Sequence, residues 1–346
     1  MREHKKELIC IILFSLILLC LSATVLSSGD RLYSPWEKRM LAQKPKFRIE
    51  DVLDGSYGSD YETWLTDQFP GRDWWVGVKT RCEILLGKKE IRGIYLGKEG
   101  YLFSDHTKTT DWDRLEQQMV GRYGQKRVSR IHVPAAGAVL TEQLPAGLVF
   151  SHREDEVWEN LYRHREEYLY YRTDHHWTMR GAYYAYEAWA KERGLAPAAL
   201  EDLGCETVKG DFLGTHYGKL HYAKEADTIE RYGPDFAGQV VYDLGESKLT
   251  GLYQWEHLDS EDAYRFFLDG NHPVVQIETG QGSGHLVVLK DSFANCLVPY
   301  LTLHYAKITV IDPRYFRADV AEWLAGQEVT EVLIVAQDTI EAEAGY

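Results

Sequence analysis

The chain has 346 residues and a formal net charge of −14, with 23 tyrosines and 10 tryptophans. This length is enough to bury a full hydrophobic core and fits one large domain with an appendage. The excess of negative charge argues against a nucleic-acid partner, which requires a basic face. The many aromatic side chains suit a protein that stacks on sugars, although they are also ordinary core residues.

The N-terminal segment predicts membrane attachment. Residues 8–26 contain no formally charged side chain, and three Lys or Arg residues precede them. Nineteen such residues are long enough to cross a bilayer, and the preceding positive charges favour a cytoplasmic N-terminus. We therefore expect residues 1–30 to be a signal anchor and residues 31–346 to lie outside the cytoplasm. A cleaved signal peptide followed by secretion is the alternative, since Val25 and Ser27 suit a cleavage site.

The five cysteines do not predict a disulfide framework. Cys10 and Cys20 lie in the apolar stretch, which leaves the odd number Cys82, Cys205 and Cys296 outside it. None of these three is followed by a second cysteine at metal-site spacing. We expect all three to be small buried residues.

Several elements are expected before the middle of the chain. Residues 31–60 are polar and are expected to form a linker, while 61–86 predict two helices separated by Pro70-Gly71. Ile91–Phe103 predicts a β-hairpin around Gly97-Lys98-Glu99-Gly100. Four further elements are expected: a helix at 115–123, a strand at 128–133, the start of a helix within 137–144 and a charged helical connection within 149–166.

Residues 168–190 are the most informative stretch. Residues 168–171 are aromatic or branched and predict a short strand. Thr178 is a natural N-cap for a helix. Apolar side chains then recur at helical spacing at Ala182, Ala185, Tyr186 and Trp189.

Asp174, His175 and His176 are therefore expected on a turn between a strand and a helix, where α/β proteins place catalytic groups. An aspartate two residues before a histidine can orient an imidazole that activates a nucleophile. The same three side chains could also bind a metal ion. A structural interpretation is equally open, in which they decorate a turn and cap the helix.

The C-terminal third predicts a parallel α/β sheet. Residues 195–280 have a mixed pattern and are expected to be loops or an insertion over this sheet. After them, strands and helices alternate, which predicts a parallel sheet covered on both faces. The expected elements are strands at 285–289, 306–311 and 329–335 and helices at 292–304 and 318–324.

Ser292 follows the first of these strands and begins its helix. A serine there has free backbone N–H groups and the positive end of a helix dipole beside it, which stabilise an oxyanion. Asp and Ser are also common N-caps without any further role. Because parallel strands bring their carboxyl ends to one edge, Asp174, His176 and Ser292 can converge there. Ser292 would then attack an acyl carbonyl, His176 would move the proton and Asp174 would hold His176.

The motif Asp174-His175-His176-Trp177 resembles that of the bacterial family named after it, the DHHW family. That family is similar to the SGNH hydrolase-like proteins of alginate O-acetylation, in which an Asp-x-His-Trp element also precedes the serine. The further matching stretches are 37–42, 67–73, 97–103, 270–273 and 290–295.

The resemblance implies a three-layer α/β/α SGNH hydrolase-like domain over residues 31–346. It also implies acetyl transfer to, or removal from, an extracellular polysaccharide, with a membrane acyl-donor transferase as a partner. Gly270 and Asn271 are the implied oxyanion-hole residues, and Asn295 and His175 are further candidates for oxyanion or substrate binding. No cofactor or metal is expected in this interpretation.

Three functions therefore compete. The first is a serine O-acyltransferase or acetylesterase of the cell envelope. The second is a glycan-binding scaffold, because Lys290 replaces a small residue of the esterase motif and residues 146–166 are shorter than the family's usual stretch. The third is a metal-dependent hydrolase that uses Asp174, His175 and His176 with the distant His272.

Overall fold

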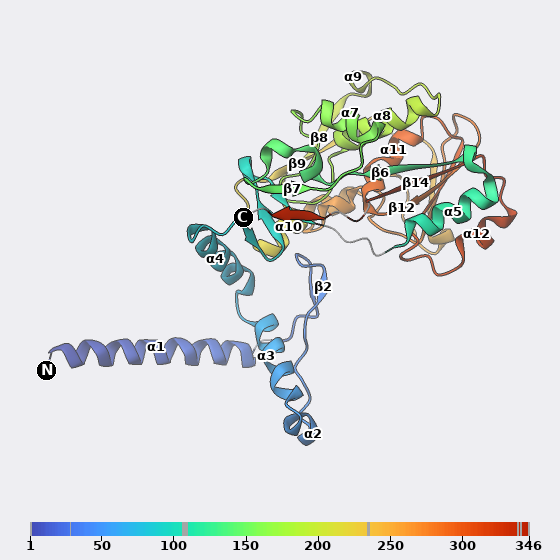
Figure 1. The fold of residues 1–346 in the computed structure, drawn as a ribbon. Helices are drawn as coiled ribbons and strands as arrows, with labels where there is room; N and C mark the ends of the chain where they lie inside the picture. Colours follow the sequence, from blue (N-terminus) through green and yellow to red (C-terminus); the bar gives the residue numbers. More distant parts are fainter. Residues whose placement is uncertain are drawn as a thin grey trace. The chain divides into compact units, whose positions relative to one another are not determined.

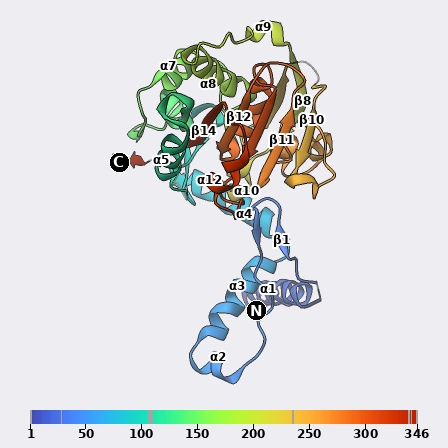
Figure 2. The same ribbon diagram turned by 90° about the vertical axis from the view of Figure 1, so that its right-hand side faces the viewer.

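The computed structural model describes residues 2–27, 29–105, 110–233, 236–337, 339 and 341–344. The chain divides into two compact units (Figures 1 and 2). The smaller unit contains Met1–Gly87 and Lys219–Tyr222, and the larger unit contains Lys88–Gly218 and Ala223–Tyr346.

The smaller unit begins with α1 (Arg2–Ser27), the helix predicted from the apolar stretch. Its segment Lys6–Thr24 is long and apolar enough to cross a membrane, and none of it is buried. The expected linker at 31–60 is wrong, because this region contains regular elements. They are the paired strands β1 (Tyr33–Ser34) and β2 (Arg39–Met40), the helix α2 (Ile49–Leu53) and the start of α3 (Ser56–Gln68).

Charged side chains explain why this region is ordered. The buried carboxylate of Asp67 accepts hydrogen bonds from the guanidinium of Arg39 at 2.5 and 2.8 Å and from the backbone N–H of Ala42 at 2.9 Å. Arg72 donates to Glu37 at 2.9 Å. Two of the stretches that resemble the DHHW family thus bind each other.

The predicted break between two helices is confirmed. The helix α4 (Arg72–Leu85) begins after Gly71, whose φ of 64° is in the left-handed region that favours glycine. Phe69 has extended backbone before Pro70, as proline requires of the residue that precedes it.

The larger unit is built on a six-stranded sheet in the order β10-β11-β13-β12-β14-β6. The strands β6, β14, β12 and β13 are parallel, whereas β11 is antiparallel to β13 and to β10. The predicted α/β class with a mostly parallel sheet is confirmed. The strand bounds are β6 Val128–Val133, β10 Gln239–Tyr242, β11 Val274–Glu278, β12 His285–Lys290, β13 Lys307–Ile311 and β14 Glu331–Gln337.

Each face of this sheet packs into its own hydrophobic core. Along β12, Leu286 and Val288 belong to one core, and Val287 and Leu289 belong to the other. This alternation follows from the two-residue period of a strand, and a fully apolar strand indicates burial on both sides. The first core includes α7 (Glu156–Arg163), α8 (Met179–Glu192) and α11 (Val298–Leu301). The second core includes α5 (Trp112–Tyr123) and α12 (Val320–Trp323).

The remaining elements surround the sheet. The predicted hairpin is confirmed as β4 (Ile94–Leu96) and β5 (Leu102–Phe103), with β3 (Glu90–Ile91) added at its edge. The other elements are α6 Ala136–Val139, β7 Leu148–Phe150, α9 Leu200–Leu203, β8 Cys205–Phe212, α10 Thr215–Leu220, β9 Asp227–Tyr232 and β15 Ala342–Ala344. The 3₁₀ turns are Lys98–Gly100, Gln125–Arg127, Thr141–Gln143, Asp243–Gly245, Trp255–Asp259, Ala263–Phe266, Ser292–Cys296 and Leu324–Gly326.

Three expectations need correction. The region 195–280 is not only loops, because β10 and β11 extend the sheet by antiparallel pairing. The helix expected at 292–304 is instead a 3₁₀ turn followed by the four-residue α11. Cys296 is buried as predicted, but Cys82 and Cys205 are exposed.

Candidate active site

The segment that carries Asp174, His175 and His176 is a loop closed on itself. Tyr170 and Trp177 form an isolated antiparallel bridge. The strand expected at 168–171 is wrong, because these residues bond across the loop and do not join the sheet. Thr178 caps α8 as predicted, accepting a hydrogen bond from the Gly181 N–H at 3.2 Å.

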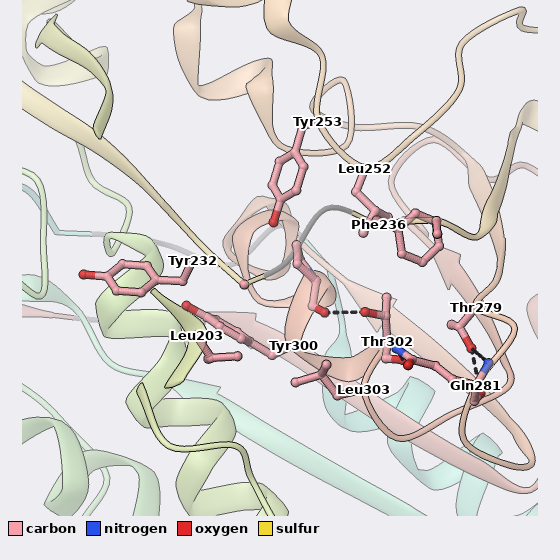
Figure 3. A pocket seen from close by; sticks show the side chains of 13 residues that line it. Leu203, Tyr232, Phe236, Leu252, Tyr253, Thr279, Gln281, Tyr300, Thr302 and Leu303 are labelled. Atoms are coloured by element: carbon pink, nitrogen blue, oxygen red, sulfur yellow. Dashed lines mark hydrogen bonds between the residues drawn. The ribbon is translucent and has the colours of Figure 1, made fainter. Parts of the chain in front are cut away.

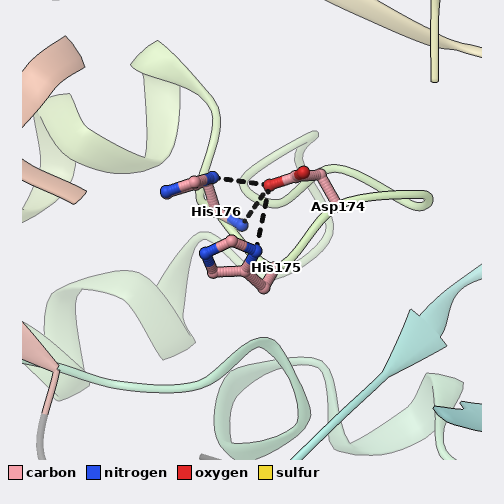
Figure 4. A group of neighbouring side chains, drawn as sticks. All are labelled: Asp174, His175 and His176. Atoms are coloured by element: carbon pink, nitrogen blue, oxygen red, sulfur yellow. Dashed lines mark hydrogen bonds and ion pairs between the residues drawn. The ribbon is translucent and has the colours of Figure 1, made fainter. Parts of the chain in front are cut away.

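The structure brings Asp174, His176 and Ser292 into one hydrogen-bonded chain. The carboxylate oxygen Oδ1 of Asp174 lies 2.5 Å from His176 Nδ1 and accepts the His176 backbone N–H at 2.9 Å (Figure 4). His176 Nε2 lies 2.7 Å from Ser292 Oγ. Because the carboxylate only accepts, Nδ1 carries the proton and Nε2 is left to accept from the serine hydroxyl. This is the arrangement that activates a serine nucleophile.

The second carboxylate oxygen of Asp174 is held by residues that the sequence did not single out. It accepts hydrogen bonds from the backbone N–H of Thr215 at 2.7 Å and from its hydroxyl at 2.8 Å. Gly214 lies directly against the same carboxylate, since a Cβ there would come within 2.2 Å of the Asp174 Cβ. Gly214 and Thr215 follow β8 (Cys205–Phe212) in the region that was expected to be loops, and the local sequence pattern carries no signal for this role.

A second buried carboxylate supports the base of this loop. Asp227 is 1% exposed and accepts from the Tyr168 hydroxyl at 2.6 Å and from the backbone N–H of Arg172 at 2.8 Å. It also accepts from the backbone N–H of Thr173 at 2.7 Å and from the Thr173 hydroxyl at 2.6 Å. Burial raises the pKa of Asp227, although these hydrogen bonds oppose the shift. Nothing in the sequence around Asp227 indicated this role.

Ser292 lies on a turn that its neighbours hold closely. The Asp291 carboxylate accepts the backbone N–H of Phe293 at 2.9 Å and that of Gln337 at 2.8 Å. The Trp177 indole donates to the Phe293 carbonyl at 2.8 Å, which ties the histidine-bearing loop to the serine turn. The expected stabilisation by an α-helix dipole does not apply, because Ser292–Cys296 is a 3₁₀ turn.

Tyr264 is a site residue that sequence reasoning missed. Its ring stacks on His176 with 3.9 Å between centroids and 12° between planes. Its hydroxyl donates to the Ser292 carbonyl at 3.2 Å. Burial raises the pKa of Tyr264 well above its usual value, so the phenol stays neutral and packs one face of the imidazole.

His175 lies beside Asp174 and His176. It is about one-third exposed, and its Nδ1–H donates to Thr215 Oγ1 at 2.8 Å. Asp174, His175 and His176 have ligand atoms within 4.8 Å of one another, so they could hold a metal ion. Both ring nitrogens of His176, however, already face Asp174 and Ser292. The structure does not bring His272 to this group, since its ring nitrogens bond Asp243 and Asp269, each at 2.7 Å.

The candidate oxyanion residues gather around one buried lysine. Lys290 Nζ donates to Asn271 Oδ1 at 2.8 Å and to Asn295 Oδ1 at 2.7 Å. The Gly270 carbonyl lies 3.5 Å from the same nitrogen, while the Gly270 N–H donates to Phe267 at 3.0 Å. The two asparagine amides are therefore better placed than the Gly270 N–H to offer new hydrogen bonds.

Figure 3 shows the lining of an aromatic cavity of about 140 Å³. Asp174, His176 and Ser292 are not among its lining residues. Its walls include Tyr232, Phe236, Tyr253 and Tyr300. Thr279, also in the wall, follows the end of β11, which pairs with the start of β13. This wall of the cavity therefore lies at the end of the sheet opposite to the carboxyl end of β12, where the serine lies.

The fold and these contacts define a mixed α/β protein whose serine, histidine and aspartate form one hydrogen-bonded chain. The protein belongs to the DHHW protein family, whose sequence model matches residues 37–129 and 153–311. The family predicted from the Asp-His-His-Trp motif is thereby confirmed.

Solved structures share this fold. A DHHW family protein from Eubacterium siraeum is 24% identical with a TM-score of 0.58, covering 72% of this chain and 91% of the other. PatB1 of Bacillus cereus with a sulfonyl adduct is 21% identical with a TM-score of 0.54, covering 72% and 96%. The O-acetyltransferase domain of Pseudomonas putida AlgJ is 16% identical, covering 71% and 91%, but its TM-score of 0.35 is too low to support an argument. No curated protein matches the sequence.

Proposed function

We propose that this protein is an extracytoplasmic serine O-acyltransferase or acetylesterase that acts on a cell-envelope or secreted polysaccharide. The observation that carries the proposal is the unbroken hydrogen-bonded chain from Ser292 Oγ through His176 to Asp174. A serine whose hydroxyl lies within hydrogen-bond distance of an imidazole nitrogen can give up its proton to that nitrogen as it attacks.

The proposed reaction has two steps. Ser292 Oγ attacks the acyl carbonyl while its proton passes to His176 Nε2, and Asp174 stabilises the resulting imidazolium. When the tetrahedral intermediate collapses, the alcohol leaves with the proton from His176 and the acyl group stays on Ser292. A sugar hydroxyl or water then attacks the acyl-enzyme, with His176 acting again as base and then as acid.

The developing oxyanion needs hydrogen-bond donors that are already in place. We propose the backbone N–H of Ser292 and the side-chain amides of Asn271 and Asn295 for this role. The Nδ2 group of Asn295 supports this assignment, because it is buried and has no hydrogen-bond partner within the described parts of the chain. His175 is proposed to line the substrate side, and Gly270 to shape the turn that presents Asn271.

One relative supports the chemistry. PatB1 carries a sulfonyl adduct, and a sulfonyl group is attacked by the same kind of activated nucleophile as an acyl group. We extend acyl transfer on a polysaccharide to this chain as a proposal, with a membrane acyl-donor transferase as the donor's source.

The location and architecture are proposed on separate grounds. The apolar helix α1 supports an anchor within residues 1–30, with the rest of the chain outside the cytoplasm, and secretion after cleavage remains the alternative. Two hydrophobic cores on opposite faces of one sheet support a three-layer α/β/α domain of the SGNH type.

The test is hydrolysis of p-nitrophenyl acetate by the full chain in detergent, together with labelling by a fluorophosphonate. We expect Ser292→Ala and His176→Ala to abolish turnover, and Ser292→Ala to abolish labelling. Ser151→Ala, at an exposed serine, is the matched control and should behave as the unmodified protein. Glycan binding without turnover or labelling would instead favour a scaffold, and sensitivity to a chelator would favour a metal-dependent hydrolase.

A further inference from the structure

Lys290 is a buried cation next to the proposed nucleophile. It is the last residue of β12 and is 1% exposed. Its shortest contacts are the two asparagine oxygens, Asn271 Oδ1 at 2.8 Å and Asn295 Oδ1 at 2.7 Å. The nearest carboxylate oxygen, on Asp312, is farther away at 3.5 Å. The Lys290 ammonium therefore lies closer to the two amide oxygens than to any carboxylate oxygen that it faces among the described residues.

These contacts determine which way both amides face. An ammonium group carries three N–H donors and no acceptor, so it can only bind the oxygen of an amide. Hydrogen bonds from a charged donor are also stronger than neutral ones. As long as Lys290 is protonated, the NH₂ groups of Asn271 and Asn295 must point away from it.

The Asn295 amide has a buried N–H donor group that is left for a ligand atom. Asn295 is 1% exposed, and its Nδ2 has no hydrogen-bond partner among the described residues. It follows Ser292 by three positions in a 3₁₀ turn. Side chains three apart eclipse one another in such a turn, so Asn295 and Ser292 share one side. A buried, unpaired donor on the side of the nucleophile is what a transient anion requires.

The Asn271 amide is presented by a strained backbone. Leu268 and Asp269, which are not glycines, have φ values of 55° and 52°, and Gly270 follows with a φ of 80°. Residues held in this left-handed region need support from their surroundings. The bond from Lys290 to Asn271 ties the end of this turn to β12.

A lysine that only filled space here would be a poor choice. Removing an ammonium from water is unfavourable, and burial lowers the pKa of Lys290 to about 8 although Asp312 opposes the shift. Arg314 donates to both oxygens of Asp312, at 2.8 and 2.7 Å, and so competes for its charge. Besides Asp312 and Arg314, the buried carboxyl of Asp291 also faces the ammonium electrostatically.

We propose that Lys290 is a positioning residue that holds the amides of Asn271 and Asn295 with their N–H donors toward the oxyanion formed at Ser292. This inference rests on the proposed acyl-transfer function. Lys290 does not touch the reacting atoms. When it loses its proton, its lone pair can accept from an amide NH₂, and the two amides are released to rotate.

The kinetic test compares Lys290→Met with Lys307→Met, a lysine on β13 at the other end of the sheet, in the full chain in detergent. We expect Lys290→Met to lower kcat for p-nitrophenyl acetate about 100-fold, the effect of losing oxyanion donors, with little change in KM. The unmodified protein should lose activity as Lys290 deprotonates at alkaline pH, and this limb should disappear in Lys290→Met. A lysine with only a structural role would lower thermal stability without altering the pH profile.

A double-mutant cycle tests whether Lys290 acts through the amides. Asn295→Ala should lower kcat in the unmodified background but have little additional effect in Lys290→Met. Additive losses would overturn the proposed coupling. So would a kcat for Lys290→Met equal to that of Lys307→Met.

A measurement without turnover separates this inference from the proposed function. With ¹⁵N-asparagine labelling in the Ser292→Ala background, the side-chain amide signals of Asn271 and Asn295 should shift together as Lys290 titrates. If they shift while the unmodified protein shows no acyl chemistry, the positioning stands and the proposed function fails. If the signals do not respond to pH between about 7 and 10, the positioning is overturned, even if Lys290→Met does not fold.

Discussion

One loop contacts Ser292 and a second contacts Lys290 at the end of β12, and the two loops are held by different physical means. The histidine loop, Tyr171–Trp177, is held by the buried carboxylates of Asp174 and Asp227, which accept hydrogen bonds largely from backbone N–H groups and hydroxyls. The amide loop, Leu268–Asn271, is instead held by charged side chains.

Asp269 is the centre of the amide loop. It accepts hydrogen bonds from His257, from Arg265 at 2.6 Å and from His272 at 2.7 Å. Burial alone would raise the pKa of Asp269, but the bonds from His272 and His257 outweigh it and lower the pKa to about 2. The comparison teaches that the loop with the proposed acid–base residues is held mainly by backbone N–H groups and hydroxyls, whereas the amide loop depends on the protonation of His272 and Lys290.

The largest effect is expected at the carboxylate that orients the base. Asp174→Asn keeps the size of the side chain but can place an NH₂ group against His176 Nδ1. Nδ1 would then have to accept a hydrogen bond, which favours the wrong tautomer of His176. We expect kcat for p-nitrophenyl acetate to fall by about 10⁴-fold, with labelling by a fluorophosphonate slowed in parallel. The new NH₂ group also faces donors of Thr215 or His176, so the free energy of unfolding should fall as well, and the rates are compared where both proteins are folded. A kcat within tenfold of the unmodified protein would remove Asp174 from the proposed mechanism.

The second effect concerns the base of the histidine loop. Asp227→Asn replaces one acceptor oxygen by an NH₂ group that faces the donors of Thr173, so buried N–H groups lose their partner. We expect the free energy of unfolding to fall by about 3 kcal/mol, measured by urea denaturation. Asp211→Asn is the control, because Asp211 is exposed and its carboxylate pairs with the nearby Lys209 side chain. Equal stability of the two variants would show that Asp227 does not hold the loop.

The third effect distinguishes the two loops by pH. Hydrogen bonds from His272 to Asp269 and Asp243 raise the pKa of His272 despite an opposing effect of burial. A raised histidine pKa stabilises the fold fully below the unfolded value of 6.5, and this stability is lost as the pH rises through the folded pKa. His272→Gln should therefore lower the free energy of unfolding by about 2 kcal/mol at pH 6 and by less at pH 9.

Urea denaturation across this pH range is the measurement. The cap variant Thr178→Ala serves as the comparison, because the bonds of the Thr178 hydroxyl join it to a backbone N–H and a backbone carbonyl, so its loss of stability should be similar at pH 6 and pH 9. A loss of unfolding free energy in His272→Gln that does not depend on pH would contradict the interpretation that protonated His272 holds Asp269 and Asp243. The free energy of unfolding should also depend on pH in acid. The stabilising contribution of Asp269 is present above pH 3.8 and is lost as the pH falls through about 2.

The smallest effect is expected at the end of the histidine loop. Thr178 accepts a hydrogen bond from the Gly181 N–H at 3.2 Å and donates one to the Tyr168 carbonyl at 2.7 Å. It therefore caps α8 and joins the start of this helix to the residues before the histidine loop. Thr178→Ala should lower the free energy of unfolding by about 1 kcal/mol. Thr178→Ser retains both bonds and should recover most of this loss. A kcat unchanged in both variants would show that the cap stabilises the helix alone.

The sequence alone was enough for features that depend on local periodicity and turn chemistry. The apolar strand at β12, the start of α8 at Thr178 and the helix break at Gly71 were all predicted, because each follows from the spacing or backbone preference of nearby residues. The Asp-His-His-Trp motif identified the family. The motif also indicated Asp174 and His176, and the position of Ser292 after an apolar strand indicated the serine. The structure places His176 within hydrogen-bond distance of both Asp174 and Ser292.

Only the tertiary structure decided how these groups are held. Tyr170 could extend a sheet or close a loop on Trp177, and its sequence favours strand geometry in both cases. Thr215, Asp227 and Tyr264 reach the site from segments whose local patterns carry no functional signal. Their contacts with residues 168–176 join positions 40 or more apart, and such contacts depend on how buried polar groups find partners after the chain has collapsed. Lys290 likewise departs from a motif when read in sequence, and only the fold surrounds it with two amide oxygens.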